Sequence, residues 1–285
     1  MGAYGAGLAM LDDSNEPRES VSAHSMEQMT TRRYTLLNKY WRVSCTGLSF
    51  AAFGIGGLGL RVLVFPLINL LIRKQERRTL WARHVIRLTF RLFIDFMRIL
   101  GVLRYNITGM ERLQRHGLLI LANHPSLIDT VLLMAFVRHA DCIVKGAMWR
   151  NPFTRGAVSA AGYISNEDGA ELVDECIASI HHGGNLIIFP EGTRTAADGI
   201  MHFKRGAANI AIRGECAITP VIIRCTPGTL GKGNKWWKVP PTVPYFEIMV
   251  QADIDITKVI GLTKNPALAA RQLTCYLQNY FMKES

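Results

Sequence analysis

Gly117-Leu-Leu-Ile-Leu-Ala-Asn-His-Pro-Ser-Leu-Ile-Asp129 is the stretch that decides the fold of this chain. The run from Leu118 to Leu121 is short and apolar and follows a glycine, which predicts a strand covered on both faces. Pro125 fits the first position of a helix and disfavours the α conformation in the residue before it. The pattern therefore predicts a helix over about 125–138, with the histidine at its mouth.

His124 and Asp129 are the first candidate catalytic pair. A carboxylate about one turn inside the helix can bind one imidazole nitrogen, which leaves the other nitrogen to take a proton from a substrate hydroxyl. Two plainer interpretations compete with this one. The chain has eight histidines, so the spacing can arise by chance, and Asp129 can serve only the positive end of the helix.

A second stretch, Phe189-Pro-Glu-Gly-Thr-Arg194, follows another apolar run and holds a carboxylate, a glycine and a guanidinium. Apolar and helical segments alternate from residue 105 onward, so we expect an α/β fold with a largely parallel sheet flanked by helices. Two strands that end in such loops predict one crevice at the carboxyl ends of the sheet. The expected strands are 118–122, 141–145, 157–165, 185–189, 217–223 and 244–253, and the expected helices are 125–138, 168–182, 205–213 and 266–282.

Together the two stretches resemble the glycerolipid acyltransferase family, typified by 1-acylglycerol-3-phosphate acyltransferases. The likeness covers roughly residues 105 to 225, because Lys145-Gly-Ala-Met-Trp-Arg-Asn-Pro152 and Ile218-Thr-Pro-Val-Ile222 resemble further blocks of the family in the same order. The resemblance implies acyl transfer from an acyl-CoA or acyl carrier protein thioester to a hydroxyl of a lysophospholipid. It also implies a general base, His124; an orienting group, Asp129; and substrate-binding residues, Glu191, Gly192, Thr193, Arg194 and Lys145.

One position departs from the family pattern. The block that ends at Asn166 usually ends in an arginine near the acceptor phosphate. The acceptor is therefore left open between a lysophospholipid and a specialised lipid or polyketide-type hydroxyl. No cofactor beyond the acyl thioester is expected, and the six scattered cysteines suggest no metal site.

The N-terminal third is strongly basic. Residues 31 to 104 hold 14 lysines and arginines but only two acids, a surplus of 12 that exceeds the net charge of +11 of the whole chain. Long apolar runs interrupt this basic region, which favours an anionic membrane surface over nucleic acid. We therefore expect three parts: a mobile tail (1–33), membrane-associating helices (34–104) and an acyltransferase domain (105–285). A non-catalytic membrane scaffold is the alternative from a different functional class.

The apolar segment Ser44–Ile72 is long enough to span a membrane, but it contains Arg61 and several glycines. Basic residues flank both of its ends. This favours a re-entrant hairpin with both ends, and the catalytic domain, on the cytoplasmic face, in a bacterial inner membrane. The following helix, Trp81–Leu103, has a narrow stripe of arginines beside a wide apolar face, which suggests that it lies in the membrane interface. Packing on the catalytic core is the alternative.

Lys232-Gly-Asn-Lys-Trp-Trp-Lys238 combines adjacent tryptophans with lysines. This composition suits a membrane interface or a lid over an acyl chain, and it suits a protein contact equally well. The sequence leaves these choices open.

Overall fold

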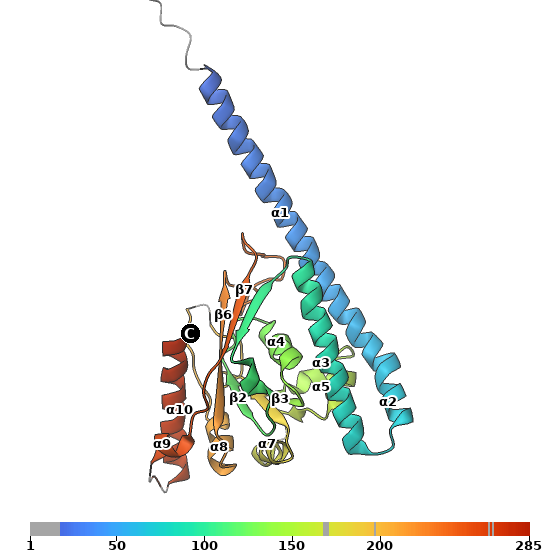
Figure 1. The fold of residues 1–285 in the computed structure, drawn as a ribbon, viewed down its shortest axis with the longest axis vertical. Helices are drawn as coiled ribbons and strands as arrows, with labels where there is room; N and C mark the ends of the chain where they lie inside the picture. The colour runs from blue at the N-terminus through green and yellow to red at the C-terminus, as the bar shows by residue number, and fades with distance from the viewer. Residues whose placement is uncertain (1–17, 168–170, 197, 262, 264) are drawn as a thin grey trace, which may run out of the picture. The chain divides into compact units, whose positions relative to one another are not determined.

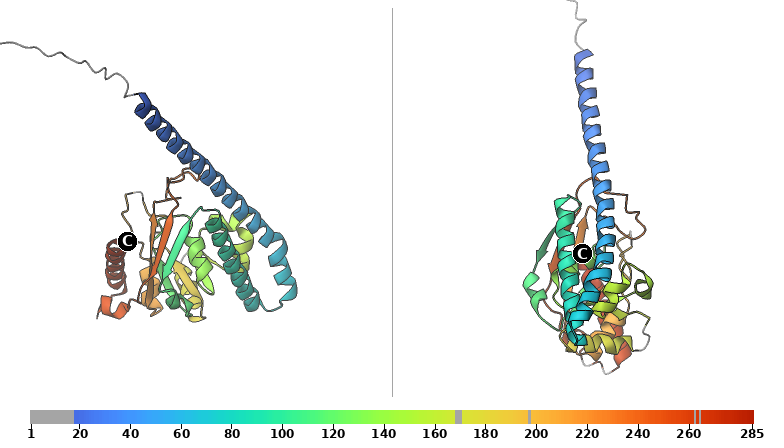
Figure 2. Two further views of the ribbon diagram at one scale, coloured as in Figure 1. Left: turned by 45° about the horizontal axis from the view of Figure 1, so that its top comes forward. Right: turned by 90° about the vertical axis from the view of Figure 1, so that its right-hand side faces the viewer.

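The structure, a computed structural model, describes residues 18–167, 171–196, 198–261, 263 and 265–285. A seven-stranded sheet lies between helices on both of its faces (Figures 1 and 2). Its strands have the order β1-β7-β6-β2-β5-β3-β4. They are Arg104–Thr108 (β1), Leu119–Ala122 (β2), Ala140–Val144 (β3), Ile164–Ser165 (β4), Asn185–Ile188 (β5), Ile218–Thr226 (β6) and Tyr245–Val250 (β7).

All neighbouring strands are parallel except β6 and β7, which are antiparallel. Strand β2 is central, and its Leu121 is paired with Ile188 of β5 on one side and Pro220 of β6 on the other. Because β2, β5, β3 and β4 are parallel, the loops that follow them all leave from the same edge of the sheet. This is the α/β architecture that the sequence predicts.

Two hydrophobic clusters cover the two faces of the sheet. Ile120 and Ala122 of β2 face the cluster that includes α3 and α4, whereas Leu119 and Leu121 face α7, α8 and α10. This alternation is the two-residue period of a strand buried on both faces. The helices are α1 (Arg18–Gly59), the π-helix η1 (Leu60–Val64), α2 (Phe65–Leu71), α3 (Gln75–Ile99), the 3₁₀-helix η2 (Met110–Gln114), α4 (Asp129–Phe136), α5 (Gly146–Arg150), α6 (Arg155–Ala161), α7 (Leu172–His181), α8 (Gly206–Arg213), α9 (Ile256–Ile260) and α10 (Pro266–Glu284).

The expected strand 157–165 is wrong over most of its length. Residues 155–161 form helix α6, and only Ile164 and Ser165 pair with β3. Small residues dominate this segment, and Val158 and Ala161 are the two that it buries. Gly162 ends the helix in the left-handed conformation (φ 59°), which glycine adopts without steric cost. A short apolar run does not separate a buried strand from a buried helix by its pattern alone.

Helix α4 begins at Asp129, four residues later than predicted, so Pro125 is not its first residue. The intervening amides are used elsewhere: Ser126 N donates to Asp129 Oδ2, and Leu127 N donates to the carbonyl of Leu230. Helix α7 likewise begins at Leu172. The first three residues of the predicted helix 168–182 lie outside the described part of the chain.

The predicted reversal inside the apolar segment is also wrong. Helix continues from α1 through η1 into α2, and the chain turns only at residues 72–74 before α3. A π-helical stretch continues the helical hydrogen bonding, and Pro66, which has no N–H to donate, lies directly after this change of helix type. The stretch Leu36–Leu71 is one helix, long and apolar enough to cross a membrane by length and composition.

The predicted tail boundary at residue 33 falls inside α1, which begins at Arg18; residues 1–17 lie outside the described part of the chain. The sequence contains no proline or glycine between Arg18 and Thr46, so nothing breaks the helix there. Residues up to Trp41 and residues from Arg42 onward form two separate compact units.

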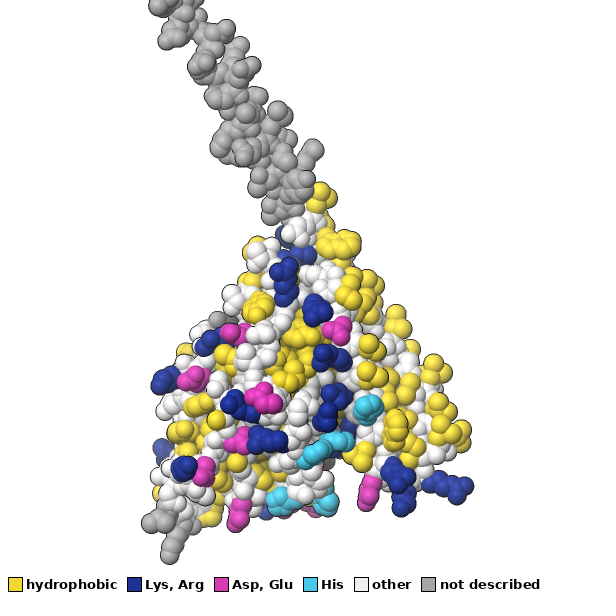
Figure 3. Space-filling view, viewed as in Figure 1, with side chains coloured by type: hydrophobic (Ala, Val, Ile, Leu, Met, Phe, Trp, Pro, Cys, Tyr) yellow, Lys and Arg dark blue, Asp and Glu magenta, His cyan; other side chains and the backbone are white. Residues whose placement is uncertain are grey.

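Helix α3 combines the two interpretations given for it. Its arginine stripe is only partly covered by protein: Arg83 is bonded to the buried Asp141 at 2.7 Å, whereas Arg91 lies over the ring of Phe136 at 4.4 Å with 45% of its side-chain surface exposed. Its opposite stripe is exposed and apolar. Figure 3 shows hydrophobic side chains gathered over α2 and α3, and the exposed ones on α3 are Leu80, Trp81, Leu88, Leu92 and Ile99.

Candidate active site

His124 lies in the loop between β2 and α4, at the carboxyl edge of the sheet. Its Nδ1 is 2.9 Å from Asp129 Oδ2, and its ring stacks on Phe189 with centroids 4.1 Å apart. Within the described residues, Nε2 has no hydrogen-bond partner, and the side chain keeps 14% of its surface exposed. The ring is thus held on two sides, with one nitrogen directed at an open part of the edge.

Asp129 is fully buried. Its Oδ2 accepts hydrogen bonds from the imidazole and from Ser126 N at 2.6 Å, while its Oδ1 has no partner among the described residues. Burial raises the pKa of Asp129 to about 6, and the bond to His124 only partly offsets that rise. The carboxylate is ionised at neutral pH, so it orients the imidazole and stabilises its protonated form.

Glu191 follows β5 and joins its loop to the histidine loop. One carboxylate oxygen, Oε1, accepts from His124 N at 3.2 Å and from Thr195 Oγ1 at 2.8 Å. Thr195 N in turn donates to the carbonyl of His124 at 2.8 Å. Burial raises the pKa of Glu191, although these hydrogen bonds act in the opposite direction. Glu191 therefore fixes the backbone that carries the histidine, 67 positions away in the chain.

Three further residues support this arrangement and carry no role in the sequence prediction. Asn123 is buried, and its side chain exchanges hydrogen bonds of 2.8 and 2.7 Å with the backbone of Ile223, which extends the contact of β2 with β6. Phe189 supplies the stacking surface, and Thr195 the two bonds described above. All three lie within or next to the quoted motifs, so adjacency to a motif was the available signal.

Arg194 is bonded to the loop between β6 and β7. Its Nη1 donates to the carbonyls of Leu230 and Gly231 at 2.8 and 2.9 Å. Gly192 is exposed and has a positive φ of 66°, and a Cβ there would lie 3.0 Å from Nζ of Lys204. Thr193 is exposed. Lys204, which is not among the predicted substrate-binding residues, therefore lies over Gly192.

Lys145 is exposed and lies at the ends of β3 and α5. Strand β5 separates β3 from β2, so Lys145 is about 10 Å along the edge from the histidine loop. Beside it, Asn166 Oδ1 accepts from Gly146 N at 3.0 Å. The next residue, Glu167, is paired with Arg150 at 3.1 Å, and its carboxylate lies over Gly146.

The candidate site lies within a segment that is similar to known proteins. Residues 104–224 match the family model described as Acyltransferase, a segment that includes His124, Asp129, Lys145 and Glu191. This segment is similar to an acyltransferase domain. The predicted resemblance to the glycerolipid acyltransferase family is thereby confirmed for this part of the chain.

Curated relatives of the acyltransferase chain carry consistent names. It is 30% identical over 162 residues to a putative 1-acyl-sn-glycerol-3-phosphate acyltransferase of Caenorhabditis elegans, covering 52% of this chain and 55% of that protein. It is 25% identical over 205 residues to a 1-acyl-sn-glycerol-3-phosphate acyltransferase of Pseudomonas aeruginosa, covering 69% and 74%. The match spans about half the length of most of the curated relatives.

The fold of the acyltransferase chain is also found in a solved structure. The crystal structure of the 1-acyl-sn-glycerophosphate acyltransferase PlsC of Thermotoga maritima superposes with a TM-score of 0.65 at 19% identity, covering 88% of this chain and 95% of that one. The shared fold confirms the predicted α/β class with its apolar N-terminal helix.

Proposed function

We propose that this protein transfers a fatty acyl chain from a thioester to a hydroxyl of a lysophospholipid-type acceptor. The observation that carries the proposal is the His124–Asp129 pair, bonded at 2.9 Å, with Nε2 free of protein partners in the described part of the chain. An imidazole oriented in this way is a general base whose proton-accepting atom points at the crevice. The acyltransferase names of the relatives support the same reaction.

The reaction needs one base and no covalent intermediate. His124 Nε2 takes the proton of the acceptor hydroxyl, and the oxygen attacks the thioester carbonyl carbon. The carbon–sulfur bond then breaks, and the imidazolium returns its proton to the departing thiolate. Asp129 holds the tautomer in which Nδ1 carries hydrogen, and its negative charge stabilises the imidazolium. The sequence has no Gly-x-Ser-x-Gly segment, which favours direct transfer over an acyl-serine route.

The donor is an acyl-CoA or an acyl carrier protein thioester, and the reaction requires no other cofactor. The apolar helix Leu36–Leu71 and the exposed apolar stripe of α3 support association with a membrane. The basic residues that follow the apolar segment, Arg73, Lys74, Arg77 and Arg78, favour the cytoplasmic face of a bacterial inner membrane for the end that leads into the catalytic domain. Such a surface would supply a lipid acceptor directly to the crevice, and nucleic acid has no part in this function.

A second candidate acceptor is a lipid or polyketide-type hydroxyl without a phosphate monoester. The part of the sheet edge beyond Lys145 favours this acceptor. There the side-chain oxygen of Asn166 accepts a hydrogen bond from Gly146 N, and the Glu167 carboxylate adds negative charge. Arg194 is already bonded to two carbonyls. A dianionic phosphate would thus meet few free cations at this end of the crevice.

Membranes that contain the protein test both candidates. Labelled acyl-CoA and acyl carrier protein are supplied in parallel with lysophosphatidic acid, lysophosphatidylglycerol and a monoacylglycerol, with a His124→Ala variant as control. Acylation by the parent but not by the variant supports the mechanism, and the reacting acceptor and donor are then identified.

Two other results are informative. Thiol release that depends on His124 without any acylated lysolipid places the acceptor outside glycerolipids. If the folded parent releases no thiol from either donor, this result contradicts the proposed acyl transfer and supports a non-catalytic membrane scaffold.

A further inference from the structure

The connection between β6 and β7 is long, and all of its charged residues are basic. Residues 227–244, called the Lys–Trp loop from here on, join two antiparallel strands that are paired up to Thr226 and Tyr245. The loop contains three lysines and no aspartate or glutamate. Its two tryptophans keep 42% and 47% of their surface exposed, although tryptophan is among the costliest side chains to leave in water.

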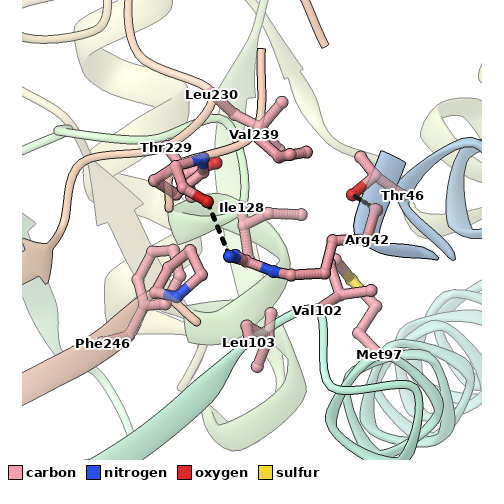
Figure 4. Close-up of a pocket in the computed structure, with 12 residues that line it drawn as sticks. Arg42, Thr46, Met97, Val102, Leu103, Ile128, Thr229, Leu230, Val239 and Phe246 are labelled. Carbon is pink, nitrogen blue, oxygen red and sulfur yellow. Dashed lines mark hydrogen bonds between the residues drawn. The ribbon is translucent and has the colours of Figure 1, made fainter. Parts of the chain in front are cut away.

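One side of the Lys–Trp loop contacts α1 where that helix becomes apolar. Trp236 lies against Gly47, where a Cβ would be 3.3 Å from its ring, and its ring centroid is 6.0 Å from that of Phe50. Arg42, one turn earlier, is buried and donates to the carbonyl of Pro240 at 2.6 Å (Figure 4). From Val43 to Leu60 the helix carries no charged residue. Trp236 is therefore held at the boundary between the polar and apolar parts of α1.

The other side of the Lys–Trp loop contacts the histidine loop. The carbonyl of Leu230 accepts from Leu127 N at 3.2 Å and from Arg194 at 2.8 Å. Leu230 is buried and has a positive φ of 50°, a conformation that costs a leucine about 1–2 kcal/mol. The bonds to Arg194 and Leu127 hold it there. The loop is thus fixed at both ends, to the apolar helix and to the catalytic loop.

We propose that the Lys–Trp loop is a docking element for an anionic lipid surface, which inserts its tryptophans at headgroup depth beside the apolar part of α1. Tryptophan prefers this depth because its ring is apolar and its N–H is polar, and each lysine near an anionic bilayer gains attraction. Lys235 lies over the ring of Trp237 at 5.1 Å, so charge and aromatic surface are presented together. The continuity with α1, the positive charge and the exposed rings all fit a bilayer.

Quenching of tryptophan fluorescence by brominated lipids tests this proposal without any enzyme assay. The chain has five tryptophans, so the Trp41→Phe/Trp81→Phe/Trp149→Phe variant reports only on the loop pair. The full chain is reconstituted into phosphatidylcholine vesicles, with or without phosphatidylglycerol, that carry bromine near the carbonyl end of the acyl chains. We expect strong quenching that increases with phosphatidylglycerol, and a blue-shifted emission.

Charge variants separate specific docking from general attraction. Lys232→Gln/Lys235→Gln/Lys238→Gln should abolish the dependence of quenching on phosphatidylglycerol. The matched control, Lys258→Gln/Arg271→Gln/Lys283→Gln, removes the same charge from exposed positions on α9 and α10 and should retain that dependence.

Three outcomes would overturn the proposal. The first is a loop pair that stays unquenched in a folded, reconstituted protein. The second is an equal loss of lipid dependence in both charge variants. The third is protection of the pair from an aqueous quencher by an acidic acyl carrier protein but not by vesicles, which would assign the loop to a protein partner.

Discussion

The two halves of the carboxyl edge of the sheet differ in how firmly their side chains are held. After β2 and β5, the edge consists of buried groups that bond one another: Asp129 is fully buried, Glu191 nearly so, and each contacts the histidine loop. After β3 and β4, the edge is exposed, and the Arg150–Glu167 ion pair there has 70% and 57% of its side-chain surface in solvent. Exposed ion pairs contribute little to stability, about 0–1 kcal/mol.

The difference indicates a division of labour. In the proposed reaction the buried half positions the base, His124, which requires fixed geometry and excluded water. The exposed half can change its charges without disturbing the fold, so it is suited to choosing between acceptors. The predictions that follow test the buried half first and the exposed half last.

His124→Ala should have the largest effect. Removal of a general base costs about 10²–10⁴-fold in kcat, while the ring lies at the edge of the sheet with 14% of its side-chain surface exposed. We expect activity near background and an unchanged melting temperature, measured by single-turnover acyl transfer and circular dichroism. A variant with a substantial fraction of parental activity would exclude this histidine as the base.

Asp129→Asn should separate activity from stability. Loss of the charge removes the stabilisation of the imidazolium and permits the tautomer of His124 that carries its hydrogen on Nε2. We therefore expect a fall in kcat of about 10²–10⁴-fold. The difference between a pKa of about 6 in the folded protein and the ordinary 3.8 means that burying the ionised group costs stability at neutral pH, by about 3 kcal/mol.

The free energy of unfolding of Asp129→Asn should therefore exceed that of the parent by about 1–3 kcal/mol at neutral pH, and by almost nothing below pH 3.8. The sign follows because a raised pKa favours the folded state at low pH and loses that contribution as pH rises through about 6. Urea titration at several pH values measures the effect. Equal stability of parent and variant at neutral pH would contradict the cost of the buried charge.

The parent enzyme should lose activity on acidification through about pH 6. Protonation of Asp129 removes the acceptor that orients His124, so kcat should fall about tenfold for each further pH unit below that value. A pH–rate profile under saturating substrate measures this limb. The limb should be missing from the residual activity of Asp129→Asn, and its persistence there would assign it to another group.

Glu191 variants test whether its charge or its hydrogen bonds matter. Glu191→Gln keeps an oxygen that can accept from His124 N and Thr195 Oγ1, so we expect a loss of only a few-fold. Glu191→Ala leaves both donors unpaired and should cost about 10-fold or more in kcat, with a lower melting temperature. Equal losses in the two variants would show that the negative charge, and not the geometry, is required.

Asn166→Arg tests the exposed half and should have the smallest effect. A guanidinium beside Lys145 could bind a phosphate bidentately, so kcat/KM for lysophosphatidic acid should rise by several-fold to about tenfold. Combination with Glu167→Gln should increase the gain by removing the competing carboxylate. The ratio of kcat/KM values for lysophosphatidic acid and a monoacylglycerol measures the change, and an unaltered ratio would place acceptor selection elsewhere.

The sequence alone determined the class of fold and predicted the residues of the candidate site. Apolar runs at 118–122, 185–189 and 217–223 identified the central strands to within a few residues, because each is buried on both faces. The helix expected over 266–282 begins at Pro266 in the structure, with the proline in its first turn and the side chain of Asn265 as its cap. These features depend on local composition and conformation, which a sequence shows directly.

Tertiary structure decided what no local pattern contains. Hydrogen bonds or contacts between segments far apart in the chain decide three features: the late start of α4, the partners of Arg194 and the place of Trp236 against α1. Arg83 and Arg91 of α3 contact the catalytic domain because Asp141 and Phe136 offer them partners there. Periodicity reports how deeply each residue of a segment is buried, but its partner is set by the packing of the whole fold.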